Sequence, residues 1–350
     1  MAFQWQVDPE DLFVERYPQM VGTGLPAADV DEVRAAITDM WPDRSGGWVH
    51  EWSRLAGRYA AAGSPWRAAL AYGWAKFPAL ADTPKRTALS RQVDQYLLAA
   101  PDFDVAFDRI IVDAPYGGGH VAVPVHVLTP PGWSAADPVL LASGGVDSWK
   151  MDLHGWFTEL ALRTGMRVLA FDIPGTGETS MPLSADRGFD VVRALIDHAR
   201  TLGGGRVAHL GISMGGYFSA RSGLAGEVDA AIVLGGPVER SFDPDRTWAY
   251  GMRGIVGNAL GFDTEPTDTE LAQRMSAFTL RQWLDQDRNA PMLVLNGADD
   301  VHIPQADTLV FKGRPETEVL LIPGTGHCAV SKFPEALRIM IDWLVASARW

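Results

Sequence analysis

The spacing of hydrophobic and polar residues changes about 100 residues into the chain. Before that point, apolar residues recur at helical intervals, as in residues 29–37 and 48–56, without strand-like alternation. Residues 105–112 and 120–128 then alternate as strands do, and a glycine-rich turn joins them as a hairpin. The pattern predicts a helical N-terminal cap domain, residues 1–103, followed by a domain built on β-strands, residues 104–350.

The second domain alternates between short apolar runs and amphipathic segments. Strands are predicted at residues 138–142, 167–172, 206–210, 229–236, 291–296 and 318–322, and helices at residues 153–163, 187–202, 217–224 and 333–348. Strand–helix–strand units bring their strands together in parallel and place helices on the sheet. We therefore expect an α/β fold with a mostly parallel, eight-stranded sheet and helices on both faces.

One segment, residues 237–290, interrupts the alternation after the sixth strand. It is far longer than an ordinary crossover, and residues 269–275 within it have a helical pattern. We expect this insert to form part of a lid over the carboxyl edge of the sheet, together with the N-terminal helices.

Composition limits the classes of partner and the compartment. The 350 residues are 47% hydrophobic, ample for a large core, and carry a formal net charge of −13. Nucleic acids and anionic membranes are bound by basic surfaces, so the acidic balance argues against both. The first residues lack a signal-peptide pattern, and no run approaches the roughly 18 apolar residues that span a bilayer. We expect a cytoplasmic protein that does not enter membranes.

Two residue types add to this picture. The single cysteine, Cys328, excludes an intramolecular disulfide and a cysteine-based metal site. Several of the 13 tryptophans lie between residues 41 and 74. Core packing is the favoured interpretation of these tryptophans, and an aromatic wall over a pocket is the alternative.

The motif with the clearest chemistry is the stretch from Gly211 to Gly216, which contains Ser213. It lies between a buried strand and a segment that continues as a helix, the arrangement of a nucleophile elbow. Such a turn is so tight that the serine backbone is strained and the flanking glycines avoid collisions. The amide of Met214 would lie at a helix N-terminus, where it can donate to a developing oxyanion.

A serine nucleophile needs a base and an orienting carboxylate, which we sought at the ends of later strands. Asp300 follows one strand and is the better candidate for the carboxylate, with Asp299 as the fallback. His327 follows the next strand in a glycine-rich loop and is the candidate base. His302 shares a loop with the acid, so we expect it at the surface or the pocket rim. Cys328 is expected to be a bystander.

A second oxyanion donor is expected from the glycine-rich loop at residues 143–150. Val146 is the first choice for this amide and Gly145 the second. In the same loop, Asp147 could hold the loop or polarise a substrate group. Asp147, Trp149 and Tyr217 are therefore candidates for the substrate pocket.

Motifs for other chemistries are absent from the sequence. It contains no phosphate-binding loop, metal-binding His-Glu-x-x-His helix or cysteine cluster. Asp172 and Glu178 have suitable side chains for a metal, but nothing in the sequence indicates that they converge. We expect neither a metal nor a cofactor.

Five stretches resemble those of the α/β-hydrolase superfamily and, within it, the FrsA-like group that includes 2,6-dihydroxypseudooxynicotine hydrolase. They are residues 144–148, 172–179, 211–217, 296–300 and 324–327. The resemblance covers residues 104–350 well and the first hundred loosely. It implies an α/β-hydrolase fold with a helical N-terminal cap and an active site buried between cap and core. It also makes a homodimer plausible.

Taken together, the residues and the resemblance predict a cofactor-free serine hydrolase. Ser213, His327 and Asp300 would form the triad, and a bulky, partly aromatic or polyketide-like ester or ketone would be the small-molecule substrate. The same triad also serves retro-Claisen cleavage of a carbon–carbon bond in a β-diketone, which is the main alternative. Acyl transfer to an alcohol or amine, and a catalytically silent binding or regulatory protein on this scaffold, are the others.

Overall fold

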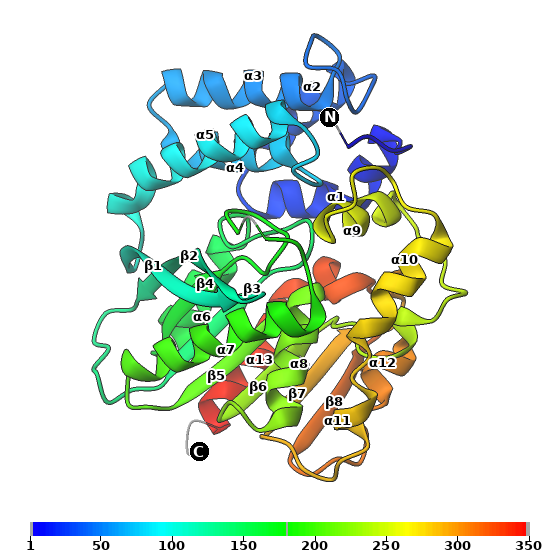
Figure 1. Ribbon diagram of the computed structural model, residues 1–350. Helices are drawn as coiled ribbons and strands as arrows, with labels where there is room; N and C mark the ends of the chain where they lie inside the picture. Colours follow the sequence, from blue (N-terminus) through cyan, green and yellow to red (C-terminus); the bar gives the residue numbers. More distant parts are fainter. Residues whose placement is uncertain (1–2, 180, 348–350) are drawn as a thin grey trace. The chain divides into compact units, whose positions relative to one another are not determined.

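The computed structural model describes residues 3–179 and 181–347, which form two compact units. One unit comprises Met1–Phe103 and Trp248–Pro266, and the other comprises Asp104–Thr247 and Thr267–Trp350. Part of the insert after the sixth strand thus packs with the N-terminal helices (Figure 1). The helix expected at residues 333–348 is α13, Phe333–Ser347, and residue 348 lies outside the described residues.

The first unit is helical. Its helices are α1 (Pro9–Gly22), α2 (Ala27–Ala36), α3 (Trp48–Ala61), α4 (Pro65–Lys76), α5 (Thr83–Ala99), the 3₁₀ turn η1 (Ala100–Asp102) and α9 (Met252–Ala259). Asp82 caps α5 by accepting from the Lys85 amide at 2.9 Å, and a proline follows the cap. Trp48 and Trp52 are fully buried among other aromatic side chains, so they fill the core of this unit, which was the favoured interpretation.

The second unit contains the sheet. Its strands are β1 (Ala106–Tyr116), β2 (Gly119–Thr129), β3 (Val139–Ser143), β4 (Arg167–Phe171), β5 (Val207–Ile212), β6 (Ala230–Leu234), β7 (Met292–Gly297) and β8 (Thr317–Ile322). Within the described residues they form one eight-stranded sheet in the order β1-β2-β4-β3-β5-β6-β7-β8. The β1–β2 and β2–β4 pairs are antiparallel and the other pairs parallel, which confirms the predicted fold class.

Helices cover both faces of this sheet. They are α6 (His154–Thr164), α7 (Ala185–Thr201), α8 (Met214–Ala225), α10 (Asp268–Met275), α11 (Arg281–Leu284), α12 (Gln305–Leu309) and α13, with the 3₁₀ segments η2 (Arg240–Phe242), η3 (Ser276–Phe278) and η4 (His327–Lys332). Helix α6 contacts α13 on one face, and α7 contacts α8 on the other (Figure 1). Strands β3, β5, β6 and β7 are buried along their whole length, as expected for strands covered on both sides.

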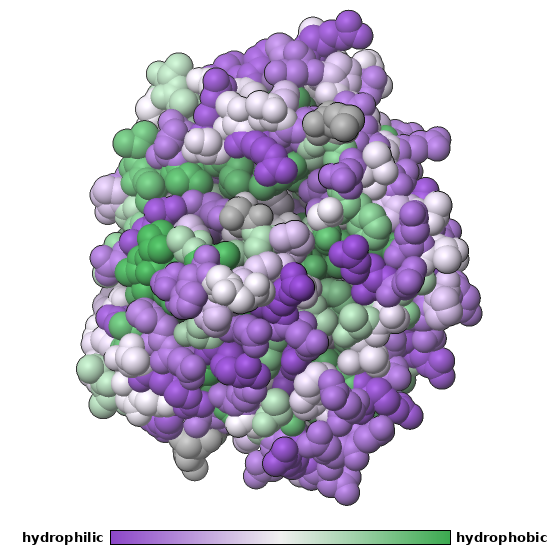
Figure 2. Space-filling view, viewed as in Figure 1, coloured by the Kyte–Doolittle hydropathy of each residue, from purple (hydrophilic) through white to green (hydrophobic). Residues whose placement is uncertain are grey.

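The surface is mainly polar on the side shown in Figure 2, where hydrophobic residues form separate patches. Exposed large apolar side chains are distributed over several elements, including Val14 of α1, Leu98 of α5 and Ile111 of β1. Single exposed apolar residues of this kind are ordinary for folded proteins. Among the described helices, none combines the length and apolar character needed to cross a membrane.

Candidate active site

Ser213 occupies the tight turn between β5 and α8. Its φ of 56° and ψ of −124° are unusual for a residue with a side chain, and its amide is tied to the Leu234 carbonyl at 2.8 Å. A Cβ at Gly211 would lie 2.0 Å from the Gly215 carbonyl oxygen, and one at Gly215 would lie 2.4 Å from the Gly144 oxygen. Only glycine fits these positions, so the packing of neighbouring backbone forces the turn that presents the serine hydroxyl.

Three side chains from different strand ends meet at this turn. The Ser213 hydroxyl lies 2.9 Å from Nε2 of His327, and Nδ1 of the same ring lies 2.7 Å from Oδ2 of Asp300. The Asp300 side chain is fully buried, whereas 14% of the His327 side chain is exposed. Both ring nitrogens of the histidine are therefore engaged, one by the hydroxyl and one by the carboxylate.

The charges of this pair reinforce each other. Burial raises the pKa of Asp300. The charge of His327 and the hydrogen bonds from His327, Asn296 and the His302 amide outweigh burial and lower that pKa to about 2. Burial lowers the pKa of His327, but the adjacent Cys328 and the Asp300 carboxylate outweigh it and raise that pKa above its ordinary value. The site thus keeps the carboxylate ionised and favours the imidazolium that forms when the ring accepts a proton.

Of the alternative residues, Asp299 lies outside this chain of contacts, whereas His302 and Cys328 adjoin it. His302 is buried at 5% exposure, so the expectation of a surface or rim position is wrong. Asp299 is exposed, and its amide donates to the Thr325 carbonyl at 3.0 Å. The His302 ring meets the His327 ring edge-on at 5.3 Å between centroids, and its backbone amide donates to Oδ1 of Asp300 at 2.7 Å. The Cys328 sulfur is buried 3.4 Å from Nε2 of His327.

The loop after β3 lies directly against the serine. A Cβ at Gly145 would lie 2.8 Å from the Ser213 Cβ and 3.5 Å from the Met214 amide nitrogen. The Gly145 amide already donates to the Ser148 carbonyl at 3.1 Å, so we retain Val146 as the candidate second oxyanion donor. The indole of Trp149 donates to the Val146 carbonyl at 3.1 Å and thereby holds this part of the loop.

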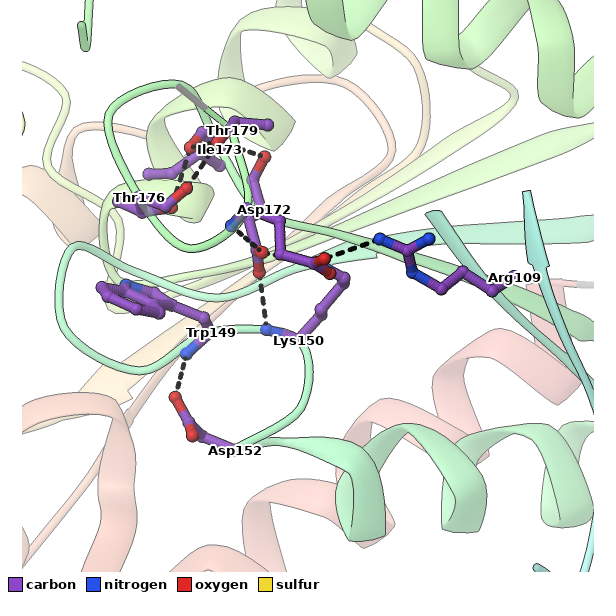
Figure 3. Close-up of polar contacts among 9 residues, drawn as sticks. Arg109, Trp149, Lys150, Asp152, Asp172, Ile173, Thr176 and Thr179 are labelled. Atoms are coloured by element: carbon purple, nitrogen blue, oxygen red, sulfur yellow. Dashed lines mark hydrogen bonds and ion pairs between the residues drawn. The ribbon is translucent and has the colours of Figure 1, made fainter. Parts of the chain in front are cut away.

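A buried charge cluster anchors the same loop, with Lys150 at its centre (Figure 3). The Lys150 ammonium lies 2.5 Å from Asp172 and 2.8 Å from Glu178, and the Lys150 amide donates to Asp172 at 2.9 Å. Arg109 adds a 2.7 Å contact to Glu178. Burial lowers the pKa of Lys150, but the two carboxylates outweigh it and raise that pKa.

Sequence reasoning missed this cluster, because nothing in the sequence indicated that Asp172 and Glu178 converge. The structure brings both carboxylates to the Lys150 ammonium. Among the described residues, no group of three or more His, Cys, Asp or Glu side chains is placed to hold a metal ion. The cluster ties the loop after β3 to the loop after β4, which fixes the loop that faces Ser213.

Replacing Lys150 by methionine tests this anchoring. Removing one partner of a buried ion pair leaves an uncompensated charge, so we expect a loss of about 3–5 kcal/mol in the free energy of unfolding. The double variant Lys150→Met/Asp172→Asn should recover part of the loss. Chemical denaturation measures both. As a control, Arg163→Met removes a surface ion pair at 3.5 Å and should cost less than about 1 kcal/mol. A Lys150→Met protein as stable as the wild type would contradict the anchoring.

The predicted pocket residues are all buried. Asp147 is 6% exposed and Trp149 is 2% exposed, both in the loop that faces Ser213. Tyr217 lies one turn into α8 and packs edge-on against Phe242 and Phe278, at 6.1 Å and 5.2 Å between ring centroids. Burial raises the pKa of Tyr217 to about 12, so it is a neutral aromatic residue. Substrate contact by these residues stays a prediction.

Comparisons with known proteins agree with the fold. A family model described as "alpha/beta hydrolase fold" matches residues 137–284. Esterase FrsA of Vibrio cholerae serotype O1 is 26% identical over 261 residues, which cover 64% of this chain and 60% of the esterase. The structure of 2,6-dihydroxy-pseudo-oxynicotine hydrolase superposes with a TM-score of 0.75 at 21% identity over 95% of each chain. The chain therefore has an α/β-hydrolase fold.

A second solved structure extends this likeness. The alignment with AbyA5 covers 97% of this chain and 99% of AbyA5, with a TM-score of 0.79 and 20% identity. At such identities the two structures show the fold alone. The sequence relatives include several proteins named Esterase FrsA, which agrees with the resemblance to the FrsA-like group. The chain spans 60% of the length of the Vibrio esterases it matches.

Proposed function

We propose that this protein is a serine hydrolase that cleaves an ester or a ketone-adjacent acyl bond of a bulky small molecule. The observation that supports this proposal is the continuous contact from Ser213 through His327 to Asp300, at 2.9 Å and 2.7 Å. The esterase and hydrolase names of its relatives agree with it. The reaction steps follow from which of these side-chain atoms can donate a proton and which can accept one.

In the first step, the Ser213 oxygen attacks the substrate carbonyl while Nε2 of His327 accepts its proton. Asp300, which accepts from Nδ1–H, holds the ring in the tautomer that leaves Nε2 free to accept. The carbonyl oxygen becomes an oxyanion, to which the amides of Met214 and Val146 donate. The imidazolium then protonates the leaving group, and an acyl-enzyme forms on Ser213.

Water completes the reaction. It attacks the acyl-enzyme as His327 again accepts a proton, and the collapse of the second oxyanion returns the hydroxyl to Ser213. Tyr217, which packs against Phe242 and Phe278, is the aromatic residue of this unit that we propose contacts a bulky, partly aromatic acyl or leaving group. A carbon leaving group would follow the same path, because both reactions pass through an oxyanion at the same carbonyl.

Two measurements on the purified wild-type protein test the proposal. A fluorophosphonate probe should label Ser213, as located by peptide mass spectrometry, and labelling should require folded protein. Nitrophenyl esters and β-diketones assayed in parallel then identify the bond: ester turnover supports the proposed activity, and diketone cleavage without ester turnover supports the carbon–carbon alternative. A folded protein that neither reacts with the probe nor hydrolyses an ester or a diketone would contradict the proposal.

A further inference from the structure

We propose that Asn296 is a positioning residue that holds the acid and the base of the triad in register from the rigid end of β7. This inference rests on the proposed function, because it concerns how Asp300 and His327 act together. It assigns a role to a residue whose side chain touches neither the serine nor, in the proposed mechanism, the substrate.

The side chain of Asn296 is fully buried and contacts both catalytic loops. Its Nδ2 donates to Oδ2 of Asp300 at 2.7 Å. Its Oδ1 accepts from the Cys328 amide at 3.0 Å and from the Gly297 amide at 2.9 Å. The amide orientation is fixed by these partners, because two backbone N–H groups face the oxygen and a carboxylate faces the nitrogen.

The contact with Cys328 fixes the peptide bond between His327 and Cys328. The backbone there is unusual, since Cys328 has φ 54° and Ala329 has φ 51°. Residues with side chains rarely adopt this conformation unless their surroundings impose it. The hydrogen bond to Asn296 is one such constraint, and it sets the position from which the imidazole projects.

The contact with Asp300 fixes the other half of the pair. Oδ2 of Asp300 accepts from two donors, Nδ2 of Asn296 and Nδ1 of His327, both at 2.7 Å. One carboxylate oxygen is therefore held between the amide and the imidazole. The Asn296 side chain thus contacts both the Asp300 carboxylate and the main chain that follows His327, and it orients the two relative to each other.

The strand beneath makes this arrangement rigid. Asn296 lies in a fully buried strand and pairs with Leu321 of β8. On another side, a Cβ at Gly235 would lie 3.1 Å from the Asn296 oxygen and 2.6 Å from the Cys328 sulfur, so the backbone there packs closely against both residues. Sites that are built on packed strands keep their geometry better than sites that depend on loops alone.

Replacing Asn296 by leucine, which has a similar volume, tests the inference. Misplacing a reacting group by about 1 Å costs on the order of 100-fold, so we expect the limiting rate of Ser213 phosphonylation by the fluorophosphonate probe to fall roughly 10- to 100-fold. The probe concentration that gives half of the limiting rate should change little. The downfield proton resonance of the His327–Asp300 hydrogen bond should weaken or disappear in the NMR spectrum.

A matched control separates positioning from stability. Asn289 also donates through Nδ2, to the Ala290 and Pro315 carbonyls at 2.8 Å, but lies at the opposite end of β7. Asn289→Leu should lower stability without changing the limiting labelling rate. If Asn296→Leu does not fold, Asn296→Ser serves instead, because the shorter hydroxyl cannot bridge Asp300 and Cys328 and should show the same loss of rate.

The outcomes distinguish this inference from the proposed function. A folded wild-type protein that is neither labelled by the probe nor active on an ester or a diketone refutes the proposed function. A labelled wild type whose Asn296→Leu or folded Asn296→Ser variant keeps both the limiting rate and the downfield proton refutes the role of Asn296 alone. Equal losses of rate in the Asn296 and Asn289 variants also refute it, because they would reflect stability only.

Discussion

Replacing Ser213 by alanine should reduce turnover of any substrate that the wild type hydrolyses by roughly 10⁶-fold, the scale for removal of a triad nucleophile. The fold should remain, because the turn is held by backbone contacts such as that between the Ser213 amide and the Leu234 carbonyl at 2.8 Å. Alanine deletes only the oxygen that lies 2.9 Å from His327. Steady-state kinetics and circular dichroism measure the two effects.

Ser219→Ala is the matched control for this variant. Ser219 is a buried serine within α8, whereas Ser213 lies just before that helix, and the Ser219 hydroxyl donates to the Ile232 carbonyl at 2.8 Å. We expect this variant to keep activity within about threefold, while losing about 1 kcal/mol of stability with its hydrogen bond. Near-normal turnover in Ser213→Ala would show that another group performs the attack.

Replacing Asp300 by asparagine should lower the maximal rate by on the order of 10⁴-fold. An asparagine side chain can donate to Nδ1, which favours the tautomer that has the proton on Nε2 and cannot accept from the serine. It also removes the negative charge that stabilises the imidazolium. The residual rate, measured with a chromogenic ester at high enzyme concentration, reports the loss.

The pH dependence of this variant has a defined sign. Asp300 raises the pKa of His327, and the ring must be neutral to accept a proton, so wild-type activity increases as the pH rises through that raised pKa. Removing the carboxylate lowers the pKa of His327. The acidic limb of the pH–rate profile should therefore move to lower pH in Asp300→Asn, and a limb that stays in place would contradict the assigned pair.

Asp299→Asn provides the control for both measurements. Asp299 is the neighbouring acid in the same loop and is exposed to solvent. Like Asp300→Asn, this substitution replaces a carboxylate oxygen by an NH2 group and removes one negative charge. It leaves the contact between His327 and Asp300 unchanged. We expect an unchanged pH profile and a rate within about twofold of the wild type.

The fold could be predicted because its signals are local. Continuous apolar runs marked the buried strands β3, β5, β6 and β7, and the long interval after β6 marked the insert. Candidate triad residues could be proposed because each follows a strand, and parallel strands bring their carboxyl ends to one edge. The order and type of the elements therefore carried most of the information.

The supporting contacts could not be predicted, because they depend on tertiary register. Lys150 is one lysine in a polar loop, and only the packing of the loops after β3 and β4 brings it to Asp172 and Glu178. Asn296 ends a strand like many other polar residues, and its partners lie 4 and 32 positions away. A signal that could have drawn attention to Lys150 is its position as the last residue of the predicted oxyanion loop.

The close approach of Gly145 to Ser213 limits how this protein can be engineered. Any side chain at that position would begin 2.9 Å from the Ser213 hydroxyl oxygen, in the space that an incoming carbonyl needs. Libraries that aim to broaden the range of accepted compounds should therefore keep the codon for residue 145 constant and place their diversity elsewhere.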